Sequence, residues 1–473
     1  ALAVHFSDLR THPLWDLAWG RSRQTKTAES RLLDAASRYL GQFRNGACPA
    51  ADGEKNLCHL ALEYIKAADR TRIPAALAPL TPPDERSLGQ IQKKLTGRQV
   101  LLKYVLLEDR MLLFFFTARG AGYEFLPVAT RPALVMVNRL AEPLEDFALG
   151  RVDYLRIHFD MELAQRLYNI FLKSVAERFP GADELFIIPD RDLFKLPFEA
   201  LVMGFNKNIQ QDDVLFSEYE AADYVIQKFA VSYYLSLADF LRPHESRGDH
   251  RYALAAFGQP LVNGSAADNA KGGRPSVGAI AAIPSTRLEI MNMGKIFSGA
   301  RRRIFLGADF NRKNFSRYAP LAGIVHIATH FFYDAADPSR SAFLFSAAGP
   351  YPSFCDARQI QKLRLPAELV ILSACETSEK DLMGFRLLGG MTAAFRRAGV
   401  RELIASLWPV DELSSQIVPL FYREYLKFGT SAAALRNAKI ALFGKTIPLR
   451  NHLRLSLAHP FLWANYVLVS FCR

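Results

Sequence analysis

The clearest feature of the sequence is a series of short apolar runs that end in polar loops. Leu369 to Leu372 is one such run. It leads through Ser373 to Cys375, a polar loop follows, and a helix is predicted from Gly384. A second run, residues 323–330 (GIVHIATH), ends in a histidine. Short apolar runs bounded by polar loops are typical of strands buried on both faces of a parallel sheet. We therefore predict two parallel strands, one ending at a histidine and the other at a cysteine.

The rest of the hydrophobic pattern predicts an α/β protein. Residues 99–107 and 111–117 are apolar runs on either side of a charged Glu-Asp-Arg triplet, which favours a hairpin. Residues 159–179 carry apolar side chains at helical spacing, and residues 185–189 form another short apolar run. From about residue 250 onward, strand-like and helix-like stretches alternate. We expect a doubly wound, mostly parallel sheet with helices on both faces.

Other stretches are predicted to be loops or a separate helical region. Residues 203–220 and 261–285 are polar and weakly patterned, so we expect exposed loops there. Residues 57–68 have helical spacing, and several prolines between residues 74 and 83 mark a linker. No period of ~34 residues is visible, so this part is not a repeat array. We expect a helical N-terminal region over residues 1–84.

His330 and Cys375 are the candidate catalytic residues. A thiol becomes a good nucleophile when a neighbouring base removes its proton, and an imidazole can serve as that base. Either residue alone would more simply be a buried structural residue. His326 competes for the role of base, because residues four apart on a strand point to the same face. Only His330 lies at the end of its run, so we predict a structural role for His326.

Four motifs occur in a fixed order. They are HIATH, which ends at His330; LVILSACET, which contains Cys375; LWPVDE at residues 407–412; and AHPFLWANYVL at residues 458–468. In this order they resemble the CHAT family, whose members are caspase- and separase-like cysteine peptidases often attached to helical TPR repeats. The resemblance covers roughly residues 85–473.

The resemblance implies a caspase-like fold in two halves. A pseudo-caspase half would occupy residues 85–245, and an active caspase-like half would occupy residues 246–473. The helical region at residues 1–84 would then be a degenerate TPR-like pair, or a helical cap on the peptidase.

The resemblance also implies roles for individual residues. His330 matches the catalytic histidine of the family and Cys375 matches its nucleophile, as a dyad without a third member. The oxyanion of the reaction would be bound by the backbone N–H groups of Cys375 and Phe331. The family usually has glycine at the positions of Phe331 and Ser378. A backbone N–H survives such a change, whereas a conformation open only to glycine does not.

The substrate pocket is predicted from strand periodicity and from the resemblance. Ser373 lies two residues before Cys375, so its side chain should share that face and line the primary pocket. Caspases have glutamine there and bind aspartate, so a serine argues against aspartate specificity. Separases have an acidic residue after the next strand, and Asp411 or Glu412 would bind a basic side chain from that place. Asp411 could equally cap the following helix, which would leave an apolar pocket for Leu or Met. Asp334 is a further candidate.

Composition narrows the class of protein. The 473 residues are 50% hydrophobic and 22% charged, which is typical of a soluble globular chain of two or three domains. A net charge of +12 would suit an acidic partner such as RNA, a membrane surface or an acidic protein, although no nucleic-acid-binding motif accompanies it. Five cysteines without a CxxC pair argue against a disulfide framework or a zinc site, and for the reducing cytoplasm.

Two further absences bear on function. No apolar run approaches the ~20 residues needed to span a bilayer. No GxGxxG or GxxxxGK[ST] motif follows a predicted strand, so a nucleotide-binding protein is disfavoured and we expect no cofactor.

One function and one alternative follow from these observations and the resemblance. We expect a regulated cysteine endopeptidase that cleaves a protein substrate, as an effector in bacterial defence or programmed cell death. A ligand, or a protein or nucleoprotein partner, would switch it on. The alternative is a catalytically weak pseudo-peptidase that keeps the fold and serves as an interaction scaffold.

Overall fold

The computed structural model describes most of the chain after residue 86. The described part is residues 87–473 without residues 108, 149–156, 207–213, 244–249, 262–282, 284, 298, 300, 333, 335–336, 347–352, 377–383, 409–415 and 449–452. The helical region predicted at residues 1–84 lies outside this part, and so does most of the loop predicted at residues 261–285.

The centre of the molecule is a sheet of thirteen strands, in the order β10-β9-β11-β14-β15-β18-β8-β4-β1-β2-β3. In addition, β12 pairs with β11, and β13 pairs with β12. Its strands are β1 (Gln99–Leu106), β2 (Met111–Phe116), β3 (Ala121–Phe125), β4 (Glu184–Ile188), β8 (Ala230–Tyr234), β9 (Tyr252–Gly258), β10 (Arg302–Leu306), β11 (Ala322–Phe332), β12 (Ala342–Phe345), β13 (Ser353–Asp356), β14 (Leu369–Glu376), β15 (Glu402–Ser406) and β18 (Tyr466–Ser470). Short strands form two smaller sheets, namely β5 (Val202–Phe205) with β7 (Ala222–Tyr224), and β16 (Thr446–Pro448) with β17 (Arg454–Ser456) and β6 (Val214–Leu215).

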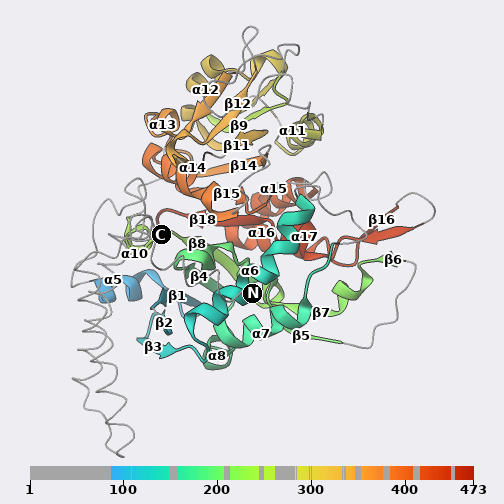
Figure 1. The fold of residues 1–473 in the computed structure, drawn as a ribbon. Coiled ribbons are helices and arrows are strands. Elements are labelled where there is room, and N and C mark those ends of the chain that lie inside the picture. The colour runs from blue at the N-terminus through green and yellow to red at the C-terminus, as the bar shows by residue number, and fades with distance from the viewer. Residues whose placement is uncertain are drawn as a thin grey trace, which may run out of the picture.

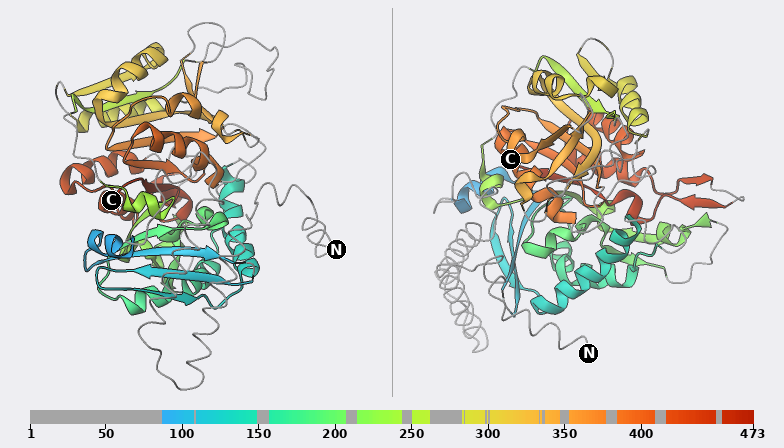
Figure 2. Two further views of the ribbon diagram at one scale, coloured as in Figure 1. Left: turned by 90° about the vertical axis from the view of Figure 1, so that its left-hand side faces the viewer. Right: turned by 45° about the horizontal axis from the view of Figure 1, so that its top comes forward.

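Two parallel blocks make up the large sheet. The strands β10, β9, β11, β14 and β15 are parallel to one another, and so are β18, β8, β4 and β1. The blocks meet at an antiparallel pair, β15 with β18, so the last strand of the chain joins the block formed by the first half. In Figures 1 and 2 the first half, blue to green, lies against the second half, yellow to red. The predicted α/β fold with a mostly parallel sheet is confirmed.

Helices cover the sheet. The α-helices are α5 (Ser87–Lys94), α6 (Thr130–Ala148), α7 (Met161–Phe171), α8 (Lys173–Arg178), α9 (Val225–Lys228), α10 (Leu237–Leu241), α11 (Ser285–Ile296), α12 (Arg312–Tyr318), α13 (Ala357–Ile360), α14 (Gly384–Ala398), α15 (Ile417–Phe428), α16 (Ser431–Ile440) and α17 (Pro460–Trp463). The 3₁₀-helices are η2 (Arg191–Lys195), η3 (Phe198–Ala200), η4 (Ser217–Ala221), η6 (Gly307–Asp309), η7 (Ala319–Leu321) and η8 (Pro338–Arg340).

The period of two along a strand distributes the apolar side chains of β1 between two layers. Leu102 and Tyr104 belong to the larger core, which includes residues of α6, α7 and α8. Leu101 and Val105 belong to a smaller core with residues of α5 and α10. Both faces of the strand are therefore buried, which explains its nearly continuous apolar sequence. In the second half every residue of β11 is buried for the same reason.

Two buried ion pairs join the halves of the chain. Arg396 of α14 donates to Asp239 of α10, and both side chains are almost wholly buried. Lys439 of α16 donates to Glu199 of η3 at 2.8 Å, and Glu199 also accepts from the hydroxyl of Tyr233 in β8. Burial raises the pKa of Asp239 and lowers that of Lys439. These ion pairs fix α14 relative to α10, and α16 relative to η3, across the junction of the two halves.

Several predicted elements need correction. The helix predicted over residues 159–179 is broken at Leu172 into α7 and α8, because Leu172 has φ −128° and ψ −16°, outside the helical range. The loop predicted over residues 203–220 contains most of β5, all of β6 and most of η4. Tyr219 of η4 is buried and its hydroxyl accepts the N–H of Phe159, so tertiary packing orders this polar stretch.

The described helices do not include a membrane span. None of them combines the length and the apolar composition that crossing a bilayer requires.

Candidate functional site

The two predicted site strands are neighbours. β11 and β14 pair in parallel, and their apolar runs set the register: Ile324 lies across from Leu369, and His330 lies across from Cys375. Both residues are near the carboxyl ends of their strands, the edge where open α/β sheets place their sites. The structure thus places the backbone of Cys375 directly beside His330.

His330 lies in a buried environment. Its exposed fraction is 3%, and its ring centroid is 6.5 Å from that of Phe332 on the same strand. β11 continues past His330, and its last two residues pair in antiparallel fashion with β12. This extension keeps His330 inside the sheet rather than on a free strand end.

Phe331, the candidate oxyanion residue after His330, is part of the regular strand. It lies across from Phe343 of β12 and is fully buried. Among the described residues other than glycine, positive φ angles occur at Phe216 and Gln259. The position of Phe331 therefore does not need a glycine-only conformation, and the departure from the family pattern there brings no backbone strain.

His326 has a different setting from His330. It is fully buried, and its Nδ1 lies 3.1 Å from the hydroxyl of Tyr422 in α15. Its Nε2 lies 2.9 Å from Oε1 of Glu289 in α11, which is within ion-pair range but lacks the alignment of a hydrogen bond. His326 lies across from Ile371, well below the strand end. These contacts connect two helices to the sheet, as expected of a structural residue.

Ser373 belongs to the same buried cluster. It is 5% exposed; its hydroxyl donates to Oε2 of Glu289 at 3.2 Å and lies 3.0 Å from the hydroxyl of Tyr466 in β18. Glu289, Tyr422 and Tyr466 were not found from the sequence. Glu289 could have been, because it is a charged residue within the buried stripe of its own helix.

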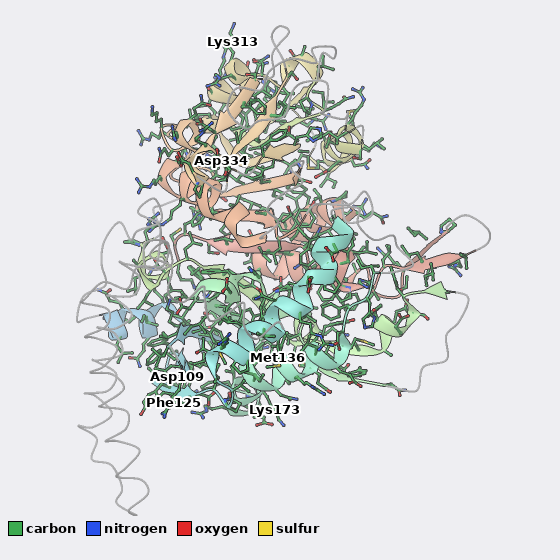
Figure 3. The ribbon with its side chains drawn as sticks, viewed as in Figure 1. Asp109, Phe125, Met136, Lys173, Lys313 and Asp334 are labelled. Carbon is green, nitrogen blue, oxygen red and sulfur yellow. The ribbon has the colours of Figure 1, made fainter. Side chains whose placement is uncertain are left out.

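Of the other predicted pocket residues, the structure describes Asp334. Asp334 pairs with Arg340 at 3.3 Å and accepts the N–H of Asp337 at 2.9 Å, which stabilises the turn after β11. Figure 3 shows it in the second half of the molecule, with Lys313. Asp411 and Glu412 lie outside the described residues.

The segments that follow the two site strands touch each other. η8 follows β11, and the Gly390 position of α14 follows β14. A Cβ at Gly390 would overlap the carbonyl group of Pro338 in η8. Glycine is therefore required here for a close backbone approach, and this contact holds the histidine segment against the cysteine segment.

Two other thiols are described, and both have a raised pKa. Burial raises the pKa of Cys355 to about 12. Burial also raises the pKa of Cys472, which is partly offset by Arg401. Neither thiol is therefore prepared for nucleophilic chemistry at neutral pH. Within the described residues, no group of three His, Cys, Asp or Glu side chains could hold a metal ion.

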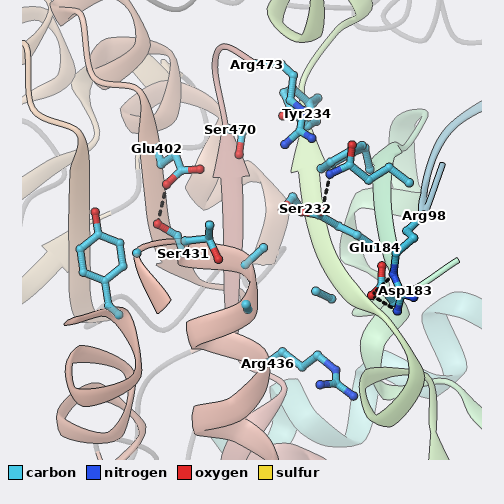
Figure 4. A pocket seen from close by; sticks show the side chains of 18 of the residues that line it. Arg98, Asp183, Glu184, Ser232, Tyr234, Glu402, Ser431, Arg436, Ser470 and Arg473 are labelled. Carbon is cyan, nitrogen blue, oxygen red and sulfur yellow. Dashed lines mark hydrogen bonds and ion pairs between the residues drawn. The ribbon is translucent and has the colours of Figure 1, made fainter. Parts of the chain in front are cut away.

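A large polar cleft lies elsewhere. It has a volume of about 790 Å³ and is lined by both acidic and basic side chains, including Glu184, Arg436 and Arg473 (Figure 4). Glu368 and Glu402 also line it, and they mark the amino ends of β14 and β15. The cleft therefore meets these strands at the edge opposite to His330 and is separate from the candidate site.

The fold and these strand ends define a class. The molecule is an α/β protein that carries a histidine and a cysteine in register near the carboxyl ends of neighbouring parallel strands. The chain belongs to the CHAT domain family, whose model matches residues 161–470. The resemblance seen in the four sequence motifs is confirmed.

Individual relatives cover less of the chain or are distant. A segment of 116 residues, 24% of this chain, is 28% identical to human (Homo sapiens) tetratricopeptide repeat protein 28 and covers 4% of that protein. The fold is also similar to a chain in the crystal structure of the Saccharomyces cerevisiae separase–securin complex. That likeness has a TM-score of 0.43 and 10% identity, and it covers 88% of this chain and 33% of the other. The chain thus spans a small part of both proteins.

Proposed function

We propose that this chain is a regulated cysteine endopeptidase of the CHAT type that uses His330 and Cys375 as a catalytic dyad. The observation that carries the proposal is the register that places these two residues directly across from each other. Neighbouring strands are about 4.8 Å apart, and residues directly opposed on them share a face of the sheet. Side chains that extend from two such positions can come within the hydrogen-bond reach that transfer of a thiol proton to an imidazole requires.

The proposed reaction follows from these roles. His330 takes the proton of the Cys375 thiol, and the sulfur attacks the carbonyl carbon of a peptide bond. Backbone N–H groups, with those of Phe331 and Cys375 as candidates, stabilise the oxyanion. The C–N bond breaks as the amine leaves with a proton from the imidazolium, and water then hydrolyses the thioester.

The burial of His330 supports a latent enzyme. His330 is 3% exposed, so a substrate does not reach its ring in this state. In this proposal an activating ligand, or a protein or nucleoprotein partner, exposes the site, and the enzyme serves bacterial defence or programmed cell death in the cytoplasm. Residues 246–473 carry the dyad in this proposal, while residues 85–245 form a supporting pseudo-caspase half.

Cleavage-site profiling of a proteome-derived peptide library tests the proposal. With cell extract added to supply the activator, and extract alone as the background, wild-type chain should yield cleavage products. Cys375→Ala and His330→Ala should each lower that rate by about 10³-fold or more, because dyad members act as a unit. Cys472→Ser is the matched control, since it removes a thiol far from the dyad. Equal cleavage by wild type and Cys375→Ala would refute the dyad.

The same burial favours a second candidate, a scaffold without catalysis. A thiol-reactive active-site probe separates the two functions. Labelling of Cys375 that depends on His330 supports the peptidase, whereas a chain that binds partners but never labels supports the scaffold.

A further inference from the structure

The polar cleft is lined by residues of both halves of the chain. Glu184 and Ser232 come from the first half, and Glu402 and Arg436 come from the second. Its volume of about 790 Å³ lies within the ~300–1,000 Å³ that is typical of small-molecule sites. Figure 4 shows Glu184 and Ser232 on one side of the cleft and Glu402 on the other. A ligand bound here would therefore contact both halves.

The N-terminus of α16 opens into this cleft. Ser431, Ala432 and Ala433 are the first three residues of the helix, and all three line the cleft. The N–H groups of a first helical turn have no acceptor within the helix, and the side chain of the N-cap residue Thr430 accepts none of them. The helix dipole adds partial positive charge at this end. The cleft thus presents backbone donors that suit an anion.

Basic side chains also line the cleft. Four of them form no ion pair in the part of the chain that the structure describes, namely Lys228, Arg401, Arg436 and Arg473. Arg436 donates from Nε to the carbonyl of Ile226 at 2.8 Å, which is a neutral acceptor. Burial lowers the pKa of Arg436. Its positive charge is therefore incompletely compensated by the protein.

Two carboxyl groups of the cleft are engaged by neutral donors. Glu184 accepts from the amide of Gln99, and Glu402 accepts from the hydroxyl of Ser431. Burial raises the pKa of both carboxyl groups. A carboxyl group that is protonated more readily repels an anion less, and it can also donate a hydrogen bond. The acidic lining therefore suits a ligand that combines an anionic group with other polar groups.

Ser232 supplies an independent sign of a ligand. It is 2% exposed, and its hydroxyl forms no hydrogen bond with any described residue. Ala230, Ser232 and Tyr234 line the cleft, so the period of two along β8 places the side chain of Ser232 on the cleft face. Tyr233 belongs to the opposite face, where its hydroxyl donates to Glu199. A buried hydroxyl without a partner calls for a bound group that supplies one.

We propose that this cleft binds a phosphorylated small molecule, with a phosphate group at the N-terminus of α16 and another polar group of the molecule at Ser232. The proposal goes beyond the peptidase function and does not depend on it. A phosphate has several acceptor oxygens, so it can accept from backbone N–H groups of α16 and from Arg436 together. The phosphate-binding motifs that the sequence lacks belong to loops after strands, whereas these donors belong to the first turn of a helix.

Isothermal titration calorimetry of the full chain with pyrophosphate tests the anion site. Wild type should bind, and Ala433→Asp should bind about 10-fold more weakly or worse, because its carboxylate lies at the helix N-terminus and repels the phosphate. Ala433→Asn is the matched control for size and should retain most of the affinity. An acidic residue in the first turn favours a helix, so Ala433→Asp should unfold in denaturant at no lower concentration than wild type.

Arg436 gives a second measurement at the same site. Arg436→Gln should weaken pyrophosphate binding by about 10-fold, and Arg436→Lys, which keeps the charge, should retain part of the affinity. Lys173→Gln removes a positive charge from an exposed side chain of α8 and should have no effect. These variants decide the question if Ala433→Asp fails to fold.

Two matched pairs of compounds test the contact with Ser232. ATP is compared with tripolyphosphate, and glucose 6-phosphate with inorganic phosphate, so that each pair differs in the organic group. The organic phosphate should bind more tightly in at least one pair, which also shows whether the ligand is a nucleotide or a sugar phosphate. Ser232→Ala should reduce that advantage by about fivefold, because it removes one hydrogen bond.

The contrary results are equally specific. Failure of wild type to bind pyrophosphate, or equal binding by wild type and Ala433→Asp, overturns the proposed phosphate site. If neither organic phosphate exceeds its inorganic counterpart, the role of Ser232 is wrong. A single-stranded RNA that binds more tightly than every small phosphate, and loses affinity in Ala433→Asp, would identify a nucleic-acid cleft instead.

Discussion

The two halves of the sheet both contain a block of parallel strands, but different residues follow those strands. In the first half, β4 is followed by Asp190, whose Oδ2 accepts the N–H of Leu106 at 2.8 Å. β8 is followed by Ser236, which is fully buried and caps α10 by accepting the N–H of Asp239. In the second half, β11 and β14 carry His330 and Cys375 at the corresponding ends.

Under the proposed function, this difference places the chemistry in the second half of the sheet. The strands compared here, β4 and β8 in the first half and β11 in the second, are almost wholly buried, so burial does not distinguish them. In the first half the polar groups after the strands satisfy backbone N–H groups and stabilise the fold. In the second half a titratable base and a thiol occupy neighbouring ends. Changes at the first-half ends should therefore alter stability, and changes at the second-half ends should alter activity.

The largest stability effect is expected where the halves are joined. Arg396→Met removes the buried guanidinium that pairs with Asp239 and should lower the free energy of unfolding by about 3–5 kcal/mol. The double variant Arg396→Met, Asp239→Leu removes both charges and should recover most of that loss. Chemical denaturation measures both. A single variant as stable as wild type would show that this pair does not hold the halves together.

Gly390→Ala should have a smaller effect on stability but should also reach the site. Its Cβ would overlap the Pro338 carbonyl and force η8 away from α14, at a cost of about 1–3 kcal/mol. Because η8 follows the histidine strand, we expect peptidase activity to fall as well. Gly429→Ala is a useful contrast, since that glycine has φ +73° and open space around it. It should lose stability through backbone strain without losing activity. Unchanged activity in Gly390→Ala would refute the coupling of the two segments.

Ser236→Ala should give the smallest effect and the sharpest contrast between the halves. It removes the helix cap after β8 and should cost about 1 kcal/mol of unfolding free energy. Activity at saturating substrate should remain that of wild type, because the residue serves the fold alone. A large loss of activity without loss of stability would mean that the first half contributes to the chemistry.

Local patterns made much of the fold predictable. The hairpin of β1 and β2 follows from two apolar runs and a charged turn, and the structure has it at Gln99–Leu106 and Met111–Phe116. The sequence predicted that His330 and Cys375 end two parallel strands. It did not predict that the two residues lie directly across from each other. The antiparallel junction of β15 with β18 was not predictable, because strand partners that are far apart in sequence are chosen by packing of the whole sheet.

Of the candidate site, periodicity predicted only which residues of one strand share a face, as for Ser373 and Cys375. It did not predict that Ser373 contacts Glu289, because these residues are 84 positions apart and Glu289 is on a helix. Asp411 and Glu412 remain predictions.

The central claim is that His330 activates Cys375, and the rate of Cys375 alkylation by iodoacetamide against pH tests it most directly. Peptide mapping resolves each thiol, and Cys355, with its pKa raised to about 12, is an internal standard that should stay unreactive. The dyad predicts a midpoint for wild-type Cys375 below the ~8.5 of an ordinary thiol, and an upward shift in His330→Ala. The same midpoint in both proteins would contradict the dyad.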